Sequence, residues 1–488
     1  MKWQNCASTL VVGLCVAAQA QAPAQELTLH ERVARVDEYA SRVHGYGGFD
    51  GAIFIAKGDQ VLLAKGWGEA DKDSHRPWTP DTVSTVGSIT KQFTGAAVTL
   101  LTQEGKLEFT DTVGDYFPDA PTDKAGITIH QLLTHSAGLP DGIGPDEEKV
   151  GREAYLARVW DRELLFAPGE RYQYSNVGYS VAAAIVEKVT GQGYEAFVRE
   201  RLFLPAGMHD TGYTIPDWDD ERFATGYRNG ERWGTVQEKQ GGDFSWHLVG
   251  NGGIHSTARD MHRWWLAIRD NTILDEAHTE IYLAPHQDEG GGESFYGYGW
   301  VNFETQSGDR MLSHNGGNGF FFADCAFFPE LDLFAFVMVN DASARALRTH
   351  DIFESLSGAP LALPPDPATV DIAAIEELAR ERALAFIEAY NSGADAYVQY
   401  GFDHRIDRGA DEALNESRRT SCEQLSARFG SWTVLTEAPR MPGQHVVNVG
   451  TKKSRQVVVV TVTLSDEPPH LVSSVTLGID GPPPPDGD

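Results

Sequence analysis

Residues 88–105 read SITKQFTGAAVTLLTQEG, and this stretch decides the fold of the N-terminal part of the chain. Its apolar residues recur at i, i+4, i+8, i+11 and i+12, which is the spacing of one helix face: Ile89, Phe93, Ala97, Leu100 and Leu101. Gly105 follows as a helix stop. Ser88 and Lys91 stand three positions apart at the start of this predicted helix, so their side chains share one face.

A serine beside a lysine can be a nucleophile with its own base. The hydroxyl attacks a carbonyl once a base takes its proton, and a lysine desolvated enough to be neutral can do that. The N-terminus of the helix adds partial positive charge beside the developing oxyanion. The pair taken alone is equally compatible with an N-capping serine above a surface lysine, so further motifs have to decide.

Tyr174 and Asn176 form a second candidate at the start of another predicted helix, Val177–Thr190. A phenol can carry protons between reacting groups, and an asparagine amide can bind a substrate carbonyl. The alternative for Tyr174 is a half-buried tyrosine with a satisfied hydroxyl. A competing Tyr227-Arg-Asn229 lies in a Gly-rich polar stretch that we predict to be a loop.

His314, Gly316 and Gly317 form the third candidate, near two predicted strands. Glycines there allow a ligand to lie along the strand edge, and the Gly317 N–H could join the Ser88 N–H in an oxyanion hole. His314 would supply a hydrogen bond or, when protonated, a charge. An isolated histidine is also often structural, and that interpretation stays open.

Ser-x-x-Lys, Tyr-x-Asn and His-x-Gly in this order resemble the three motifs of the serine beta-lactamase and penicillin-binding protein superfamily, in its class C-like branch. The resemblance covers about residues 30–355 and includes five further stretches: Ile127–Pro140, Phe166–Gly191, Leu202–Thr211, Gly252–Asp260 and Tyr296–Trp300. It implies an α/β (α+β) sandwich of the beta-lactamase/transpeptidase type with an all-helical subdomain.

The resemblance also implies an acyl-enzyme mechanism that needs no metal and no cofactor. It implies three catalytic residues, namely Ser88 as nucleophile, Lys91 as general base and Tyr174 as proton relay. It implies four substrate-binding residues, namely Asn176, His314, Gly316 and Gly317. The substrate would be a small molecule, an ester, an amide or a peptide.

His314 stands where this superfamily usually has the lysine of Lys-Thr-Gly. A lysine cation favours a carboxylate-bearing substrate, whereas imidazole is mostly neutral at pH 7. The formal charge of −30 also opposes anionic substrates and general nucleic-acid binding. We therefore predict esterase, amidase or D-aminopeptidase-like activity before beta-lactamase activity. The alternative is a non-catalytic protein that senses a peptidoglycan fragment or a beta-lactam.

The N-terminus has the pattern of a secretory signal peptide. Lys2 precedes a short apolar run at residues 9–18, and Ala18-Gln-Ala20 is a small-x-small cleavage signal. We predict removal of residues 1–20, a periplasmic or secreted protein, and no stable membrane insertion, because no later stretch is long and apolar enough. Cys325 and Cys422 would remain, and the sequence leaves open whether they pair.

Predicted strands at both ends of the first domain favour one sheet built from distant pieces: Gly51–Ala56, Gln60–Lys65, Gly319–Phe328 and Leu331–Asn340. After a Pro-rich linker, we predict a helix and then four strands: Asp371–Tyr390, Ala427–Glu437, His445–Lys452, Gln456–Ser465 and His470–Ile479. This order resembles the cone-shaped, α+β nuclear-transport-factor-like fold, with an accessory role in packing, binding or oligomerisation.

The predicted organisation therefore has five parts. They are a signal peptide (1–20), the hydrolase domain (27–358), a linker (359–370), the accessory domain (371–480) and a disordered tail (481–488).

Overall fold

The computed structural model describes residues 27–228, 230–241, 244–342, 347–364, 366–369, 371–404, 412–441, 444–451, 457–464 and 472–480. The predicted signal peptide and the predicted tail lie outside these residues. Within the predicted linker, residues 359–364 and 366–369 contain no helix or strand. No helix in the described part of the chain combines the length and the apolar character that a membrane span needs.

The first domain is built on one antiparallel sheet of eight strands, in the order β2-β1-β14-β13-β12-β11-β10-β9. The strands are β1 (Gly51–Lys57), β2 (Gln60–Trp67), β9 (Gln287–Asp288), β10 (Ser294–Tyr296), β11 (Val301–Glu304), β12 (Arg310–Gly317), β13 (Phe322–Phe328) and β14 (Leu333–Val339). β1 pairs with β14 from Gly51 opposite Val339 to Lys57 opposite Leu333. The two ends of the domain thus meet in one sheet, as the sequence predicts.

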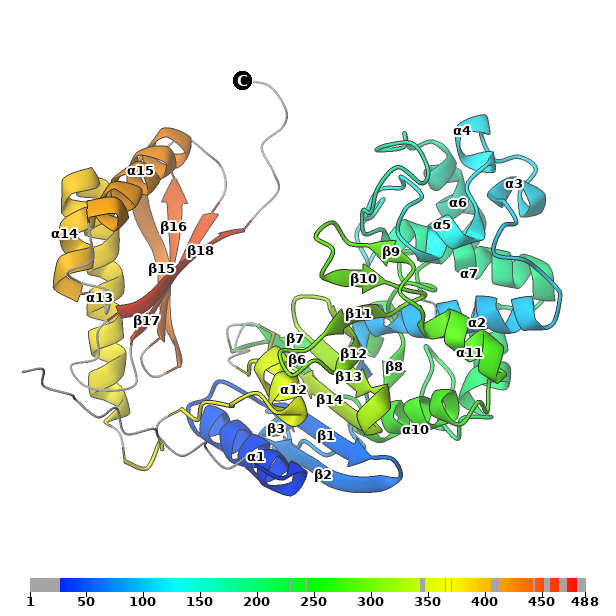
Figure 1. The fold of residues 1–488 in the computed structure, drawn as a ribbon, viewed down its shortest axis with the longest axis horizontal. Coiled ribbons are helices and arrows are strands. Elements are labelled where there is room, and N and C mark those ends of the chain that lie inside the picture. The colour runs from blue at the N-terminus through cyan, green and yellow to red at the C-terminus, as the bar shows by residue number, and fades with distance from the viewer. Residues whose placement is uncertain are drawn as a thin grey trace, which may run out of the picture.

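Helices cover both faces of this sheet (Figure 1). Ile53 and Ile55 of β1 pack in one core cluster with α1 (Leu29–Gly45) and α12 (Thr349–Ser357). Phe54 lies on the opposite face, in the core cluster that contains α10 (Ala258–Arg269). Alternate residues of a strand point to opposite faces, so a strand buried on both faces has a continuous apolar sequence.

The helical part of the domain holds α2 (Thr90–Gln103) against α7 (Asn176–Thr190). Smaller elements complete it: α3 (Val113–Tyr116), α4 (Thr122–Ala125), α5 (Ile129–Leu133), α6 (Arg152–Trp160), α8 (Tyr194–Val198), α9 (Val236–Gln240) and α11 (Glu276–Leu283). Short strands are β3 (Glu69–Asp71), β4 (Arg76–Pro77), β5 (Ser84–Thr85), β6 (Gly226–Arg228), β7 (Glu231–Gly234) and β8 (His255–Ser256).

The two helices predicted from the sequence begin and end close to their expected positions. A 3₁₀ turn at Gly87–Ile89 precedes α2, so Ser88 lies just before the α-helix rather than within it. The Ser175 side chain caps α7 by accepting from the Gly178 N–H, and Gly191 ends the helix with a φ of 69°. These local signals are caps and a helix stop, which the sequence shows directly.

The predicted loop around Tyr227 is wrong. Residues Gly226–Arg228 form strand β6, which pairs with β7, and Tyr227 is buried. The Tyr227 hydroxyl accepts from the Lys72 N–H at 2.7 Å and donates to Asp71 Oδ1 at 3.2 Å. These long-range partners outweigh the Gly-rich local sequence, and they place Tyr227 outside the candidate site. Asn229 lies outside the described residues.

The C-terminal domain contains α13 (Ile372–Ser392), α14 (Ala394–His404) and α15 (Glu412–Phe429), followed by an antiparallel sheet, β15-β16-β17-β18. Its strands are β15 (Trp432–Met441), β16 (Gln444–Thr451), β17 (Val457–Leu464) and β18 (Val472–Asp480). The predicted start of the first strand at Ala427 is wrong, because residues 427–429 complete α15. Helices before a sheet agree with the predicted α+β order, and the relation to the nuclear-transport-factor-like fold stays a prediction.

The stacking of Tyr390 on Trp432, with ring centroids 3.8 Å apart, joins α13 to β15 in this domain. Cys422 is buried here, whereas Cys325 is buried in β13 of the first domain. Both are free thiols, so the structure answers the pairing question that the sequence leaves open.

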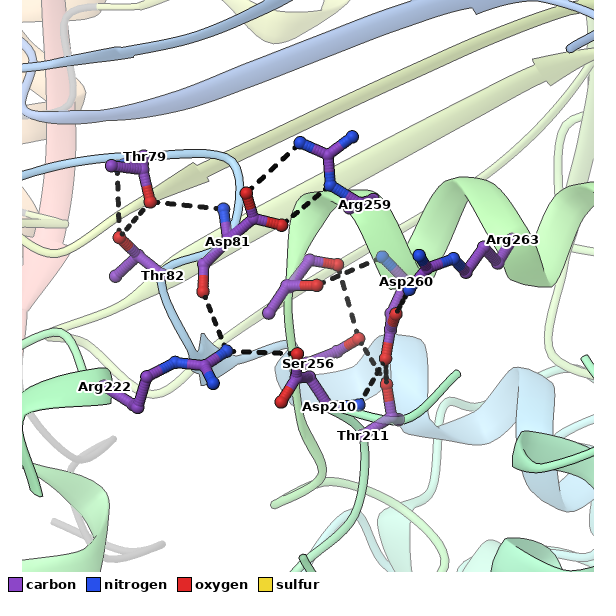
Figure 2. Close-up of polar contacts among 11 residues, drawn as sticks. Thr79, Asp81, Thr82, Asp210, Thr211, Arg222, Ser256, Arg259, Asp260 and Arg263 are labelled. Carbon is purple, nitrogen blue, oxygen red and sulfur yellow. Dashed lines mark hydrogen bonds and ion pairs between the residues drawn. The ribbon is translucent and has the colours of Figure 1, made fainter. Parts of the chain in front are cut away.

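A buried carboxylate on α10 fixes the strand that leads to Ser88 (Figure 2). Asp260 Oδ2 accepts from the Asp210 N–H at 2.7 Å and from Thr211 Oγ1 at 2.9 Å, and Oδ1 accepts from Arg263 at 2.6 Å. Thr211 Oγ1 lies 2.8 Å from Ser256 Oγ in β8. Because β8 pairs with β5, this network supports the segment that runs into the Ser88 turn.

We expect Asp260→Ala to lower the free energy of unfolding by about 3 kcal/mol, because it leaves the Asp210 N–H and the Thr211 hydroxyl without their buried acceptor. Urea unfolding followed by circular dichroism measures this. Asp270→Ala is the matched control at the exposed end of the same helix, where an ion pair with Arg269 contributes less than about 1 kcal/mol. Equal losses in the two variants would contradict a supporting role for Asp260.

Candidate active site

Ser88 and Lys91 lie side by side, and two asparagines complete the group. Lys91 Nζ is 3.0 Å from Ser88 Oγ, 2.7 Å from Asn176 Oδ1 and 2.7 Å from the backbone carbonyl oxygen of Asn251. Asn176 begins α7, and its Nδ2 donates to Asp141 Oδ1 at 2.9 Å. The first two predicted motifs therefore meet at one amine.

The surroundings of Lys91 favour a neutral amine. Burial lowers the pKa of Lys91 well below its usual value of 10.5, although Asp141 and Asp146 act in the opposite direction. A neutral amine has two N–H bonds and one lone pair. Asn176 Oδ1 and the Asn251 carbonyl can only accept hydrogen bonds, so they take the two N–H bonds. The lone pair then faces the Ser88 hydroxyl, which can donate.

Tyr174 lies beside the same amine. Its ring centroid is 4.8 Å from Lys91 Nζ. Burial raises the pKa of Tyr174, and a hydrogen bond with the Ser88 side chain partly opposes this rise. The phenol is therefore protonated at neutral pH and can act as a proton donor. The ring of His135 packs on it at 4.2 Å, and His135 Nδ1 in turn accepts from the Ser175 N–H at 3.0 Å.

Two glycines allow β12 to lie directly against the turn that carries Ser88. A Cβ atom on Gly316 would lie 2.2 Å from the Val86 carbonyl oxygen and 2.4 Å from the Ser88 backbone nitrogen. A Cβ atom on Gly87, which has a φ of +52°, would lie 2.5 Å from the Gly317 nitrogen. Side chains at these positions would separate the Ser88 and Gly317 N–H groups, which are the predicted oxyanion donors.

The beta-lactamase family model matches residues 36–357, and these include every predicted site residue. The chain belongs to the beta-lactamase family. Among its relatives, penicillin-binding protein 4* of Bacillus subtilis is 30% identical over 286 residues, which cover 55% of this chain and 63% of that protein.

Other curated relatives agree with this family. The putative penicillin-binding protein PbpX of B. subtilis is 28% identical over 57% of this chain and 67% of its own length. Protein flp of Staphylococcus aureus strain COL is 26% identical over 54% of each chain. The chain thus spans between about half and two thirds of the length of these relatives.

Solved structures confirm the predicted fold class. A penicillin-binding protein from Bacillus halodurans has a TM-score of 0.56 and 25% identity, covering 67% of this chain and 99% of that one. FmtA from S. aureus has a TM-score of 0.57 and 21% identity, covering 68% and 90%. An octameric penicillin-binding protein homologue from Pyrococcus abyssi has a TM-score of 0.56 and 20% identity, covering 93% and 90%.

The contacts of His314 are those of a buried neutral imidazole. Its Nδ1 lies 2.6 Å from the Asn315 carbonyl oxygen, so Nδ1 carries the proton and Nε2 accepts from the Tyr296 hydroxyl at 2.9 Å. Burial, with a smaller effect from Lys91, lowers the pKa of His314 to about 3. The ring is therefore neutral and orients Tyr296, and a direct contact between His314 and substrate stays a prediction.

A cavity of about 110 Å³ lies beside Ser88. Ser88, Asn176 and Gly317 line it together with Asn251, and His314 is absent from its described lining. Ser88 is partly exposed whereas Lys91 is fully buried, so a small molecule can reach the hydroxyl while the amine stays out of contact with solvent. Within the described ranges, no three His, Cys, Asp or Glu side chains gather in a way that could hold a metal ion.

Sequence reasoning missed two groups at this site. Asn251 contacts Lys91 through its backbone carbonyl, which no side-chain pattern reveals, although its place in a Gly-Asn-Gly-Gly run is a signal of close packing. Asp141 holds Asn176 from a loop, and its position directly after the stretch Ile127–Pro140 is the local indication of its role.

We expect Gly316→Ala to reduce kcat/KM by about 100-fold or more, because the added methyl would displace the Ser88 turn and small misplacements at a reacting centre have effects of this size. Steady-state hydrolysis of an activated ester measures it, with circular dichroism to establish folding. Gly126→Ala is the control, since a Cβ there meets no atom within 4 Å. Unchanged activity in Gly316→Ala would show that β12 does not constrain the nucleophile.

Proposed function

We propose that this protein is a serine hydrolase that forms an acyl-enzyme on Ser88. The observation that carries the proposal is the contact of the buried Lys91 Nζ with Ser88 Oγ at 3.0 Å. When the amine is neutral, Asn176 Oδ1 and the Asn251 carbonyl accept its two N–H bonds, and the remaining electron pair is directed to Ser88 Oγ. A hydroxyl with a buried base at this distance meets the geometric requirement for an activated nucleophile.

In the first step, the proton of Ser88 moves to Lys91 Nζ while Oγ forms a bond to the substrate carbonyl carbon. The carbonyl electron pair moves to its oxygen, which the Ser88 and Gly317 N–H groups would stabilise. The carbonyl then re-forms, the bond to the leaving group breaks, and the leaving group takes a proton through Lys91 or Tyr174. Water next attacks the acyl group, releasing the acid and restoring the Ser88 hydroxyl.

We propose esters and amides as the substrate class, including small esters and D-amino peptides. The absence of a lysine at position 314 supports this choice, because the buried neutral imidazole offers no charge for the carboxylate of a beta-lactam. Penicillin-type substrates are therefore expected to be turned over less efficiently than small neutral esters.

The decisive experiment incubates the protein with p-nitrophenyl butyrate, a D-amino acid p-nitroanilide and a fluorescent penicillin. We expect Ser88→Ala to abolish both turnover and acylation of the protein. Release of the product measures the turnover, and mass spectrometry of the protein measures the acylation. Lys91→Met should lower kcat by about 1,000-fold, the usual contribution of a general base. Circular dichroism of both variants establishes that they fold.

The outcomes separate the two candidate functions. Turnover that survives Ser88→Ala would remove Ser88 as the nucleophile. An absence of both acylation and turnover across the whole panel would overturn the hydrolase and favour the non-catalytic binding protein. Saturable binding of the penicillin without a covalent bond would then be the expected observation.

The pH profile gives an independent test of Lys91. Only the neutral amine accepts a proton, so kcat/KM should rise with pH as Lys91 loses its proton. Because burial lowers the pKa of Lys91 well below 10.5, we expect the plateau well below that pH. A profile that still rises at pH 10, with the fold intact by circular dichroism, would contradict a desolvated base. His314 should add no transition above pH 5, because it is already neutral there.

We also propose that the protein is exported to the periplasm or the medium and that it self-associates through its C-terminal domain. The predicted signal peptide at residues 1–20 supports export. Self-association is supported by the octameric homologue from P. abyssi, whose likeness extends over 93% of this chain.

A further inference from the structure

His135 has a backbone conformation that few side chains adopt. It follows α5 with a φ of 56°, in the left-handed region, and only 1% of its surface is exposed. Residues other than glycine are uncommon in this region, and histidine, asparagine and aspartate are the types found there most often. Such conformations persist where the surrounding structure holds them in place, so the contacts of His135 show what the conformation provides.

Two atoms of His135 hold the turn that contains Tyr174 and Asn176. The His135 carbonyl oxygen accepts from the Gln173 N–H at 2.8 Å, and its Nδ1 accepts from the Ser175 N–H at 3.0 Å. These two N–H groups flank Tyr174 in the chain. The backbone on both sides of Tyr174 is therefore bonded to a single residue.

The ring of His135 also connects the second and third motifs. It packs against Tyr174 and Tyr296, with ring centroids 4.2 and 4.4 Å apart. The Tyr296 hydroxyl in turn donates to His314 Nε2 at 2.9 Å. His135 thus contacts Tyr174 directly and reaches His314 through one tyrosine.

The hydrogen bond from Ser175 requires a neutral His135. Burial, with a smaller effect from Lys91, lowers the pKa of His135 well below 6.5. Because Nδ1 accepts, the proton is on Nε2, which has no hydrogen-bond partner among the residues that the structure describes. His135 is also absent from the described lining of the cavity beside Ser88. It therefore offers neither a hydrogen-bonded path for a proton nor a surface for a substrate in that cavity.

We propose that His135 is a positioning residue of the hydrolase, which keeps the turn at residues 174–176 against the buried amine of Lys91. This inference rests on the proposed function, because it concerns the same reaction. Ser175, whose N–H binds Nδ1, directly precedes Asn176, whose Oδ1 is 2.7 Å from Lys91 Nζ. Small displacements at a reacting centre lower rates strongly, so loss of the acceptor should act on kcat.

Two substitutions of His135 test this role. His135→Leu removes the acceptor and the ring, whereas His135→Asn keeps an acceptor oxygen close to the place of Nδ1 and a residue type that adopts the left-handed backbone. For p-nitrophenyl butyrate, we expect His135→Leu to lower kcat by about 100-fold or more with little change in KM, and His135→Asn to recover about tenfold of that loss. Equal kcat values in the two variants, or a loss confined to KM, would overturn the positioning role.

His262→Leu is the matched control for the loss of a buried histidine. His262 lies on α10 and is 6% exposed, its Nε2 donates to the Gly58 carbonyl oxygen at 2.9 Å, and its ring packs on Phe54 and Phe334. We expect this variant to lose stability in urea unfolding and to keep the kcat of the unchanged protein. A fall in kcat as large as that of His135→Leu would assign the effect to general destabilisation and overturn the proposal.

Nitrogen NMR of the imidazole rings tests the contact without any turnover. In protein labelled with ¹⁵N-histidine, we expect His135 to be the neutral Nε2–H tautomer from about pH 5 to about pH 9, because Nδ1 is a buried acceptor. The resonance that is missing in His135→Asn assigns the ring. An Nδ1–H tautomer, or protonation with a midpoint at the ordinary value of about 6.5, would overturn the acceptor role even if His135→Leu fails to fold.

The two measurements separate this inference from the proposed function. Turnover that requires Ser88 but is unchanged in His135→Leu would overturn the positioning role alone. The Nε2–H tautomer in a protein that shows neither acylation nor turnover would retain His135 as the residue that holds the turn, and it would overturn the hydrolase.

Discussion

The buried amine of Lys91 is the constraint on which the site depends. A fully buried charge is expensive to hold, and burial lowers the pKa of Lys91, which favours the neutral form of the amine with its N–H bonds satisfied. Its two acceptors come from distant segments, Asn176 at the start of α7 and the backbone of Asn251. Three parts of the chain must therefore be positioned accurately before the lone pair of Lys91 faces Ser88.

The rest of the first domain provides that positioning. The Asp260 network fixes β8, which follows the Asn251 segment and pairs with β5, the strand that leads to Ser88. From the other side, β12 approaches the same turn through Gly316, where no side chain fits. Because β12 is an inner strand of the eight-stranded sheet, the core that aligns the sheet also sets the distance between Ser88 and Gly316.

The sequence predicts those features that depend on near neighbours. Helix α2 follows from apolar spacing, and the contact of Ser88 with Lys91 follows from their separation of three residues. Features set by distant partners could not be predicted, such as the hydrogen bonds that join the Tyr227 hydroxyl to Asp71 and Lys72. The meeting of Ser88, Lys91 and Asn176 was predicted only through family resemblance. The hydrogen bond between His314 and Tyr296 joins residues eighteen positions apart, and no local pattern predicts it.

The neutral imidazole of His314 bears on the protonation of Lys91. A second amine near Lys91 would compete with it for protons, because each cation lowers the pKa of the other. Lys91 already lowers the pKa of His314 in this way. With a neutral imidazole at position 314, Asp141 and Asp146 raise the pKa of Lys91 without an opposing charge from that position. Burial therefore sets the direction of the Lys91 pKa shift, and the two carboxylates limit how far that pKa falls.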